Sequence, residues 1–299
     1  MKVMKDVQEK YKIRPFMDMD DEMDRAGLKK SLWFIFGLYL IKYKQKLFER
    51  LVKIMSFFTR MMPLINFKAF LKPHYKYEMD GRFLFMNRLE KNPLMRNILE
   101  DYRLQKIWEP ETTKIVKEKV KRGDICLDIG ASIGYFTLLF SSLVGPIGKV
   151  VAVEPTSFQI PYLKKNIEIN DYNDRAIVEE CAAWDKTEMV SVPLNSERRN
   201  QTHLQGKTID DIVENYGLRK VDFIKIDTDG SEPWIIKGMI KTVERNPNLK
   251  MVIEYYPQYV YDAGGNMKEF DDFLNKYFKC QIITNEYDKK HYNLYCERL

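Results

Sequence analysis

Short apolar runs alternate with amphipathic stretches from residue 123 to the end of the chain. The apolar runs predict buried strands at 124–128, 149–154, 176–181, 222–227 and 249–254. Apolar residues recur at helical spacing over 135–144, 157–170 and 232–246. Strands that alternate with helices indicate a parallel α/β sheet. Two further strand-like runs, at 281–286 and 292–297, predict a closing hairpin whose last strand is antiparallel.

The first part of the chain has a different pattern. The run 32–41 is apolar but has only 10 residues, whereas a helix that crosses a membrane needs about 20. Apolar residues then recur at helical spacing over 47–62, among many lysines and arginines. This pattern suits a helix on an anionic membrane surface, but equally a helix that packs on its own domain or on a second copy. We therefore divide the chain into a helical, basic, amphipathic extension at 1–75, a hairpin and helical lead-in at 76–122, and the α/β domain at 123–299.

Composition narrows the class of protein. The chain has 299 residues, 45% of them hydrophobic, and a net charge of +6, which is too weak to indicate nucleic-acid binding by itself. Its four cysteines lack the spacing of metal ligands, and Cys126 and Cys181 lie in apolar runs that predict buried thiols. The start of the chain is too polar for a signal peptide. We therefore expect a cytoplasmic protein, with a peripheral position at the inner face of the membrane as the alternative.

A glycine-rich turn follows the first strand of the domain. The run 124–134 reads D-I-C-L-D-I-G-A-S-I-G and leads into a helix-like segment. Its glycines do not have the spacing of a dinucleotide fingerprint, and no phosphate-binding P-loop fits the chain. The remaining interpretation is the loop that binds S-adenosylmethionine (SAM), in which glycine lets the backbone approach the ligand. Asp128 could then accept a charge-assisted hydrogen bond from the cofactor's ammonium group. The alternative is an ordinary strand–turn–helix with structural glycines.

The second strand ends in a carboxylate, Glu154, 24 residues after Gly130. An acidic residue about 20 positions after a glycine-rich loop can accept both ribose hydroxyls of a nucleoside. Alone, such a residue is more often a helix cap or a solvated charge. Paired with the glycine-rich turn, Glu154 is interpreted as the ribose ligand.

A second acidic motif, D-F-I-K-I-D-T-D-G-S-E, spans 222–232. We expect Asp227 or a neighbour to orient an acceptor hydroxyl, to accept its proton or to contact the amine of SAM. Glu254 and then His203 are the other candidates for the general base. Glu232 opens a helix, so its carboxylate could simply cap that helix. The sequence predicts no metal site, although a carboxylate cluster could hold Mg²⁺.

The motifs D-I-G-A-S-I-G-Y-F-T, V-V-A-V-E-P, C-A-A-W-D and K-I-D-T-D-G-S-E occur in this order, and a W-E-P-E segment precedes them. Together they resemble the FkbM family of SAM-dependent methyltransferases, over about 105–260. The resemblance implies a Rossmann-like class I methyltransferase fold and methyl transfer to an oxygen, usually a hydroxyl of a sugar or secondary metabolite. The chain has Ser132 where members often have Asn, and Asp229 where they commonly have Glu.

The resemblance also implies roles for individual residues. The residues implied to bind SAM are Asp128, Gly130, Ala131, Ser132, Gly134 and Glu154. Those implied to lie near its adenine are Cys181, Ala182 and Asp185. Asp227 and Glu232 are implied to line the reaction centre.

Two other classes of function stay open. One is a non-catalytic, membrane-associated binding protein that keeps the fold, but the chain retains both Asp128 and Glu154. The other is a nucleic-acid methyltransferase, but 227–230 reads D-T-D-G, unlike the N-P-P-Y-type run common in amino-methylating enzymes. We expect a small-molecule, glycan or lipid hydroxyl as acceptor and no nucleic acid. Peripheral membrane contact through 30–62 and a homodimer are both compatible with the sequence.

Overall fold

A computed structural model describes residues 74–79, 81–87, 107–193, 201–283 and 292–299. All of them belong to one compact unit, Pro73–Leu299. The amphipathic extension predicted at 1–75 lies outside the described residues except for its last two positions, so its helical character stays a prediction.

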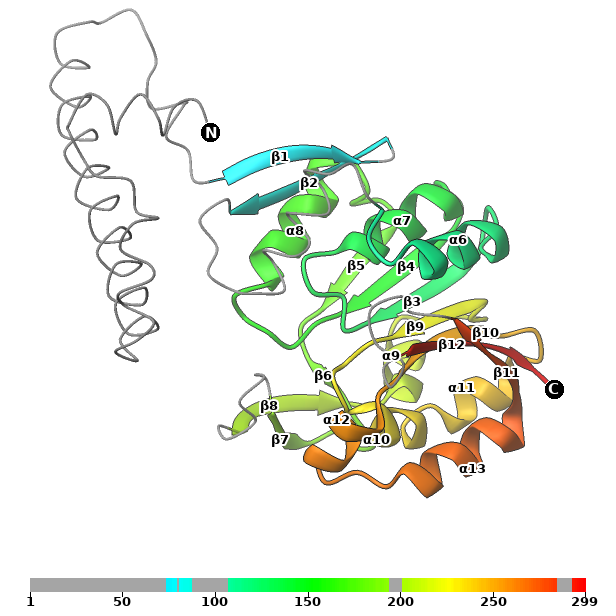
Figure 1. The fold of residues 1–299 in the computed structure, drawn as a ribbon. Helices are drawn as coiled ribbons and strands as arrows, with labels where there is room; N and C mark the ends of the chain where they lie inside the picture. Colours follow the sequence, from blue (N-terminus) through cyan, green and yellow to red (C-terminus); the bar gives the residue numbers. More distant parts are fainter. Residues whose placement is uncertain (1–73, 80, 88–106, 194–200, 284–291) are drawn as a thin grey trace, which may run out of the picture. The chain divides into compact units, whose positions relative to one another are not determined.

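The domain is built on a seven-stranded sheet with the strand order β11-β12-β10-β9-β3-β4-β5 (Figure 1). Its strands are β3 (Ile125–Ile129), β4 (Lys149–Val153), β5 (Ala176–Glu179), β9 (Phe223–Ile226), β10 (Lys250–Tyr255), β11 (Phe278–Ile283) and β12 (Tyr292–Arg298). β12 is antiparallel to both of its neighbours, while the pairs among β10, β9, β3, β4 and β5 are parallel. The predicted Rossmann-like sheet with an antiparallel last strand is confirmed.

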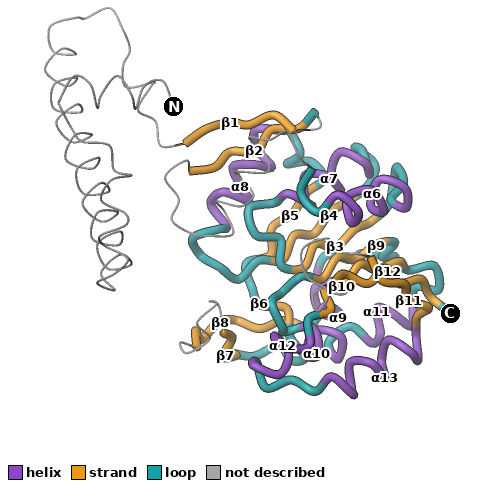
Figure 2. Tube along the Cα trace, in the orientation of Figure 1, coloured by secondary structure: helices purple, strands orange, loops and turns teal. Residues whose placement is uncertain are grey.

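Helices cover both faces of the sheet (Figure 2). On one face, α6 (Pro110–Lys119), α7 (Tyr135–Val144) and α8 (Ile160–Ile169) bury Val116, Phe140 and Leu163 against the sheet. On the other face lie α9 (Ile209–Asn215), α10 (Glu232–Lys237), α11 (Ile240–Arg245), α12 (Pro257–Asp262) and α13 (Met267–Tyr277). Because side chains alternate along a strand, Cys126 of β3 joins the first core and Leu127 joins the second. Burial on both faces explains why these strands are apolar throughout.

The hairpin predicted around Asp80-Gly81 is present as β1 (His74–Met79) and β2 (Arg82–Asn87). Its second strand is attached to α8, because the Phe83 and Phe85 amides donate to Asn170 Oδ1 at 2.7 Å and Asn166 Oδ1 at 2.5 Å. Pro110 opens α6, at a position where its missing N–H costs nothing.

Several expectations from the sequence were wrong. No strand was predicted between 181 and 222, yet a three-stranded sheet, ordered β6-β8-β7, forms there from β6 (Ala182–Ala183), β7 (Met189–Pro193) and β8 (Gln201–Lys207). The helix predicted at 232–246 is two helices, which separate at Gly238. A Cβ on that glycine would lie 2.1 Å from the Trp184 carbonyl oxygen, so the chain there packs on another backbone segment.

The cysteines also differ from expectation. Cys126 and Cys181 are free and buried, as predicted. Cys280 and Cys296 form a disulfide, which was not anticipated from the expectation of a cytoplasmic protein. The cause is the register, because the antiparallel pairing of β11 with β12 places these two residues opposite each other. None of the described helices combines the length and apolarity that a membrane-spanning segment requires.

Candidate active site

The ends of four strands meet at one edge of the sheet. Ile129 of β3 pairs with Val153 of β4 and with Ile226 of β9, and Ile226 pairs with Ile253 of β10. The chain leaves β3 toward β4 on one side and later returns to β9 on the other. In open α/β sheets, this reversal point is where ligands bind. The residues that follow these strands are Gly130, Glu154, Asp227 and Glu254.

The glycine-rich turn presses against its neighbours in the protein. Gly130 has φ 82°, and a Cβ there would lie 1.9 Å from the Asp227 carbonyl oxygen. Gly134 has φ 98°, and its Cβ would lie 2.7 Å from Leu163 Cδ1. Both positions therefore require glycine for backbone conformation and for space. The turn at β3 is thereby held directly against the end of β9.

Glu154 is tied to the same turn. The Ser132 amide donates to its Oε2 at 2.7 Å, and the Thr156 amide donates to its Oε1 at 2.8 Å. Burial raises the pKa of Glu154, although the hydrogen bonds from Thr156 and Ser132 oppose this. Ser132 has φ 52°, and its Oγ is shielded from solvent with no hydrogen-bond partner among the described residues. A carboxylate and an orphaned hydroxyl thus meet where the nucleoside of SAM was predicted.

Asp128 lies below the turn, with 2% of its surface exposed. The Thr137 hydroxyl donates to its Oδ2 at 2.5 Å. Burial raises the pKa of Asp128 to about 6, despite the lowering effects of Lys225 and Thr137. The predicted acidic residue is therefore present at the turn, but protein atoms surround it.

Lys225 is the cation at the centre of the site, and it is 3% exposed. Its Nζ donates to Asp227 Oδ2 at 2.6 Å and lies 4.4 Å from the centre of the Phe136 ring. Burial lowers the pKa of Lys225, but Asp227, Glu109 and Asp128 outweigh this and raise the pKa overall. By its place on the strand that precedes Asp227, Lys225 was expected to be able to hold the carboxylates that follow it in place. The sequence predicted no role for Glu109, whose approach depends on the path of the segment before α6.

Two of the predicted catalytic carboxylates are buried beside Asp227. Glu254 is 4% exposed and Glu232 is 1% exposed. Burial, with repulsion from Asp227, raises the pKa of Glu232 to about 7 and raises that of Glu254 well above its ordinary value. The amide and hydroxyl of Thr228 both donate to Glu232 Oε1, at 2.9 and 2.8 Å. Glu232 thus bonds to the turn before its own helix, and α10 has no side-chain cap at its N-cap residue Ser231.

The remaining predicted residues lie apart from this cluster or face inward. His203 is an exposed residue of β8, where its Nδ1 bonds with Ser191 Oγ at 2.9 Å. Cys181 and Ala182 are buried, and burial raises the pKa of Cys181 to about 12. Asp185 is half-buried and follows Trp184, whose ring stacks on Trp234. Contact between Cys181, Ala182 or Asp185 and an adenine stays a prediction.

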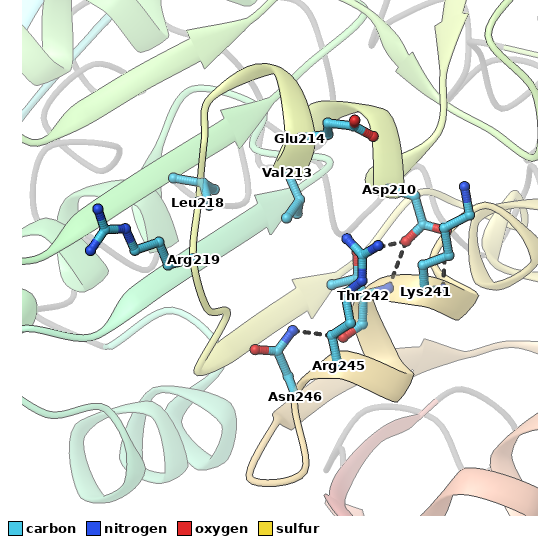
Figure 3. Close-up of a pocket in the computed structure, with 9 residues that line it drawn as sticks. All are labelled: Asp210, Val213, Glu214, Leu218, Arg219, Lys241, Thr242, Arg245 and Asn246. Carbon is cyan, nitrogen blue, oxygen red and sulfur yellow. Dashed lines mark hydrogen bonds between the residues drawn. The ribbon is translucent and has the colours of Figure 1, made fainter.

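A cavity of about 230 Å³ lies elsewhere (Figure 3). Its lining includes Arg219 and Arg245, which precede β9 and β10, so the cavity is at the amino ends of these strands. None of the residues predicted for the site lines it. Within the described part of the chain, no group of three or more His, Cys, Asp or Glu residues is arranged to hold a metal ion.

Comparison with known proteins gives a family match. The model of the methyltransferase FkbM domain matches residues 128–281, more than half of the chain. No curated protein matches the sequence.

Three solved structures illustrate the similarity. Methyltransferase FkbM from Methylobacillus flagellatus KT is 17% identical, with a TM-score of 0.44 over 68% of this chain and 53% of that one. A SAM-dependent methyltransferase from Aquifex aeolicus is 19% identical, with a TM-score of 0.43 over 70% and 100%. A methyltransferase from Streptococcus mutans, in complex with S-adenosylhomocysteine (SAH), is 10% identical, with a TM-score of 0.42 over 63% and 96%.

Proposed function

We propose that this protein transfers a methyl group to a hydroxyl oxygen, on the basis that the chain belongs to the FkbM methyltransferase family. Its cofactor is SAM, which supplies an electrophilic methyl group on a sulfonium. The acceptor we propose is a hydroxyl of a glycan, of a lipid-linked sugar or of a secondary metabolite. What this chain contributes is alignment, removal of a proton and exclusion of water around the reacting oxygen.

The residues at the edge of the sheet fit the cofactor. Glu154 would accept the ribose hydroxyls, since each of its oxygens takes one backbone amide and keeps a further lone pair. The buried Ser132 hydroxyl, which lacks a partner among the described residues, would gain one. Asp128 would support the turn from below through its bond with Thr137.

The observation that supports a hydroxyl as the methyl acceptor is that the clustered carboxylates differ in exposure, so that one of them is accessible to act as a base. A hydroxyl must lose its proton during transfer, so a general base is useful. Glu254 is buried, and burial with repulsion from Asp227 raises its pKa well above its ordinary value, so its environment favours the protonated form over the carboxylate that a base requires. Asp227 is 31% exposed in its side chain. Lys225 binds Asp227 Oδ2, and we assign Oδ1 to the acceptor hydroxyl.

Asp227→Asn tests this assignment, with Asp229→Asn as the matched control in the same turn. Asp229 has φ 53°, a conformation that asparagine adopts readily, so the control preserves the backbone. We expect Asp227→Asn to lower the single-turnover rate roughly 100- to 10,000-fold at saturating SAM, as loss of a general base does. Asp229→Asn should change the rate far less. Equal losses in both variants would contradict the role of Asp227.

The product distinguishes oxygen from nitrogen transfer. SAM carrying a ¹³C methyl group would be incubated with a panel of sugars, sugar nucleotides, lipid alcohols and a structured RNA. An ether methyl and an N-methyl differ in their ¹³C resonance. Methyl transfer to the RNA bases, with none to hydroxyls, would overturn the proposal.

We also retain the proposals of peripheral membrane contact through 30–62 and of a homodimer. They rest on the basic amphipathic pattern of the sequence, in residues that the structure does not describe. Flotation with anionic and neutral vesicles, with and without residues 1–72, would test the membrane contact. A full-length protein that ignores anionic vesicles would exclude it.

A further inference from the structure

Glu109 has an unusual backbone conformation and a charged side chain. It precedes α6 with φ 41° and ψ 69°, the left-handed region. Residues other than glycine occupy this region at a cost, and such residues concentrate at functional sites. Glycine or asparagine would hold this turn more easily than glutamate does. The presence of glutamate indicates that the carboxylate itself is needed there.

Contacts from two other elements hold the Glu109 carboxylate at the edge of the sheet. Asn293 of β12 donates from Nδ2 to Glu109 Oε2 at 3.0 Å, and the same nitrogen donates to Thr112 Oγ1 at 3.1 Å. Glu109 Oε1 lies 3.9 Å from Lys225 Nζ, too far for a hydrogen bond. Lys225 instead gives its short contact, at 2.6 Å, to Asp227. Glu109 is thus oriented toward the site, and none of the described lysines or arginines comes within hydrogen-bond distance of its carboxylate.

The carboxylates around Lys225 outnumber this one cation, so the site can accept a second cation. Three carboxylates, those of Glu109, Asp227 and Asp128, interact with this single ammonium group. Asp128 is buried and bonded to Thr137. The side chains of Glu109 and Asp227 are 21% and 31% exposed, whereas that of Lys225 is 3% exposed. Two partly open carboxylates therefore flank a buried cation, and carboxylates so placed favour a cationic ligand.

We propose that Glu109 is a cofactor-binding residue that accepts a hydrogen bond from the α-ammonium group of SAM. This inference rests on the cofactor of the proposed function and adds a residue from outside the glycine-rich motif. Asp128 was the residue predicted from the sequence to bind the ammonium group of SAM. In the structure that carboxylate is enclosed by protein, and the more accessible one belongs to the segment before α6.

The test compares three ligands by calorimetric titration at constant pH. SAM and SAH carry the amino-acid end, whereas 5′-methylthioadenosine lacks it. The variants are Glu109→Gln and Glu109→Asn, the second of which keeps the left-handed turn without the charge. Glu111→Gln is the matched control, because Glu111 is an exposed acid two residues along the same segment. Circular dichroism and the melting temperature verify that each variant is folded.

We expect both Glu109 variants to weaken SAM and SAH roughly 10- to 100-fold, the size of a lost charged hydrogen bond. The affinity for methylthioadenosine should be unchanged, and Glu111→Gln should bind all three ligands as the wild type does. Equal weakening of all three ligands would assign Glu109 a structural role and overturn the proposal, as would unchanged binding of SAM. A folded wild type that binds none of them would overturn both this inference and the cofactor. Failure of the oxygen acceptor alone would leave the binding pattern intact.

Discussion

Charged side chains gather in two regions of this domain. One is at the carboxyl ends of the strands, and the other is the cavity described above, which forms a groove between α9 and α11. In the first region Asp128, Lys225 and Glu254 are at most 4% exposed. In the groove, Arg219, Lys241 and Arg245 are exposed to solvent (Figure 3). Burying a charge is costly unless it is paired and hydrogen-bonded, while a solvated charge needs no explanation. The burial of charge therefore identifies the site better than the presence of a cavity does.

Removal of the buried cation should have the largest effect. Lys225→Met leaves the carboxylates of Asp227, Asp128 and Glu109 without their shared counter-ion, and we expect a loss of about 3–5 kcal/mol in the free energy of unfolding. The control is Lys220→Met, since Lys220 forms a half-exposed pair with Asp222. That pair should contribute less than about 1 kcal/mol. Urea denaturation measures both values, and similar losses would show that burial of the charge does not separate the two pairs.

The pH dependence of stability should reveal Asp128. Its pKa is 3.8 in an unfolded chain and about 6 in the folded protein. The folded state therefore holds this proton more tightly, and stability present below the lower value is lost as the pH rises through the higher one. The loss is about 3 kcal/mol at most. Asp128→Asn should remove this part of the slope between pH 4 and 7 in urea titrations, and an unchanged slope would contradict the buried-carboxylate assignment.

The close contact of the glycine-rich turn predicts a smaller effect. Gly130 and Gly264 have nearly the same φ, 82° and 80°, but a Cβ meets the Asp227 carbonyl at the first and nothing within 4 Å at the second. Alanine strains the backbone at both positions. We therefore expect Gly130→Ala to cost about 1–3 kcal/mol more than Gly264→Ala, because of overpacking alone. Thermal unfolding gives the difference, and equal costs would mean that the turn can move away from β9.

The sequence predicted the parts of the fold that depend on local pattern. The apolar runs located β3, β4, β5, β9 and β10, because a strand buried on both faces must be apolar along its whole length. The split between α10 and α11 was missed, since it depends on the contact of Gly238 with Trp184. The β7–β8 pair was missed because β8 is polar, and a polar strand resembles a loop.

The residues of the site likewise divide into those that a local sequence pattern identifies and those that only tertiary contacts bring together. Asp128, Glu154 and Asp227 could be found because each lies in a motif directly after or within a predicted strand. Glu109 and Asn293 meet across 184 residues of sequence, and no local pattern reports this contact. The pairing of Cys280 with Cys296 depended on strand register in the same way. Spacing along the chain thus identifies motif residues, whereas partners brought together by register require the structure.

The smallest predicted effect lies in the groove between α9 and α11. Lys241→Gln leaves the Lys241 amide free to donate to Asp210 Oδ2, as it does now at 3.1 Å, so α11 keeps its cap. The free energy of unfolding should change by less than about 0.5 kcal/mol, as for most surface substitutions. SAM affinity should not change, because the groove and Asp227 lie at opposite ends of β9. Weaker SAM binding in this variant would mean that the exposed charges are coupled to the buried ones, and the two regions would have to be treated as one.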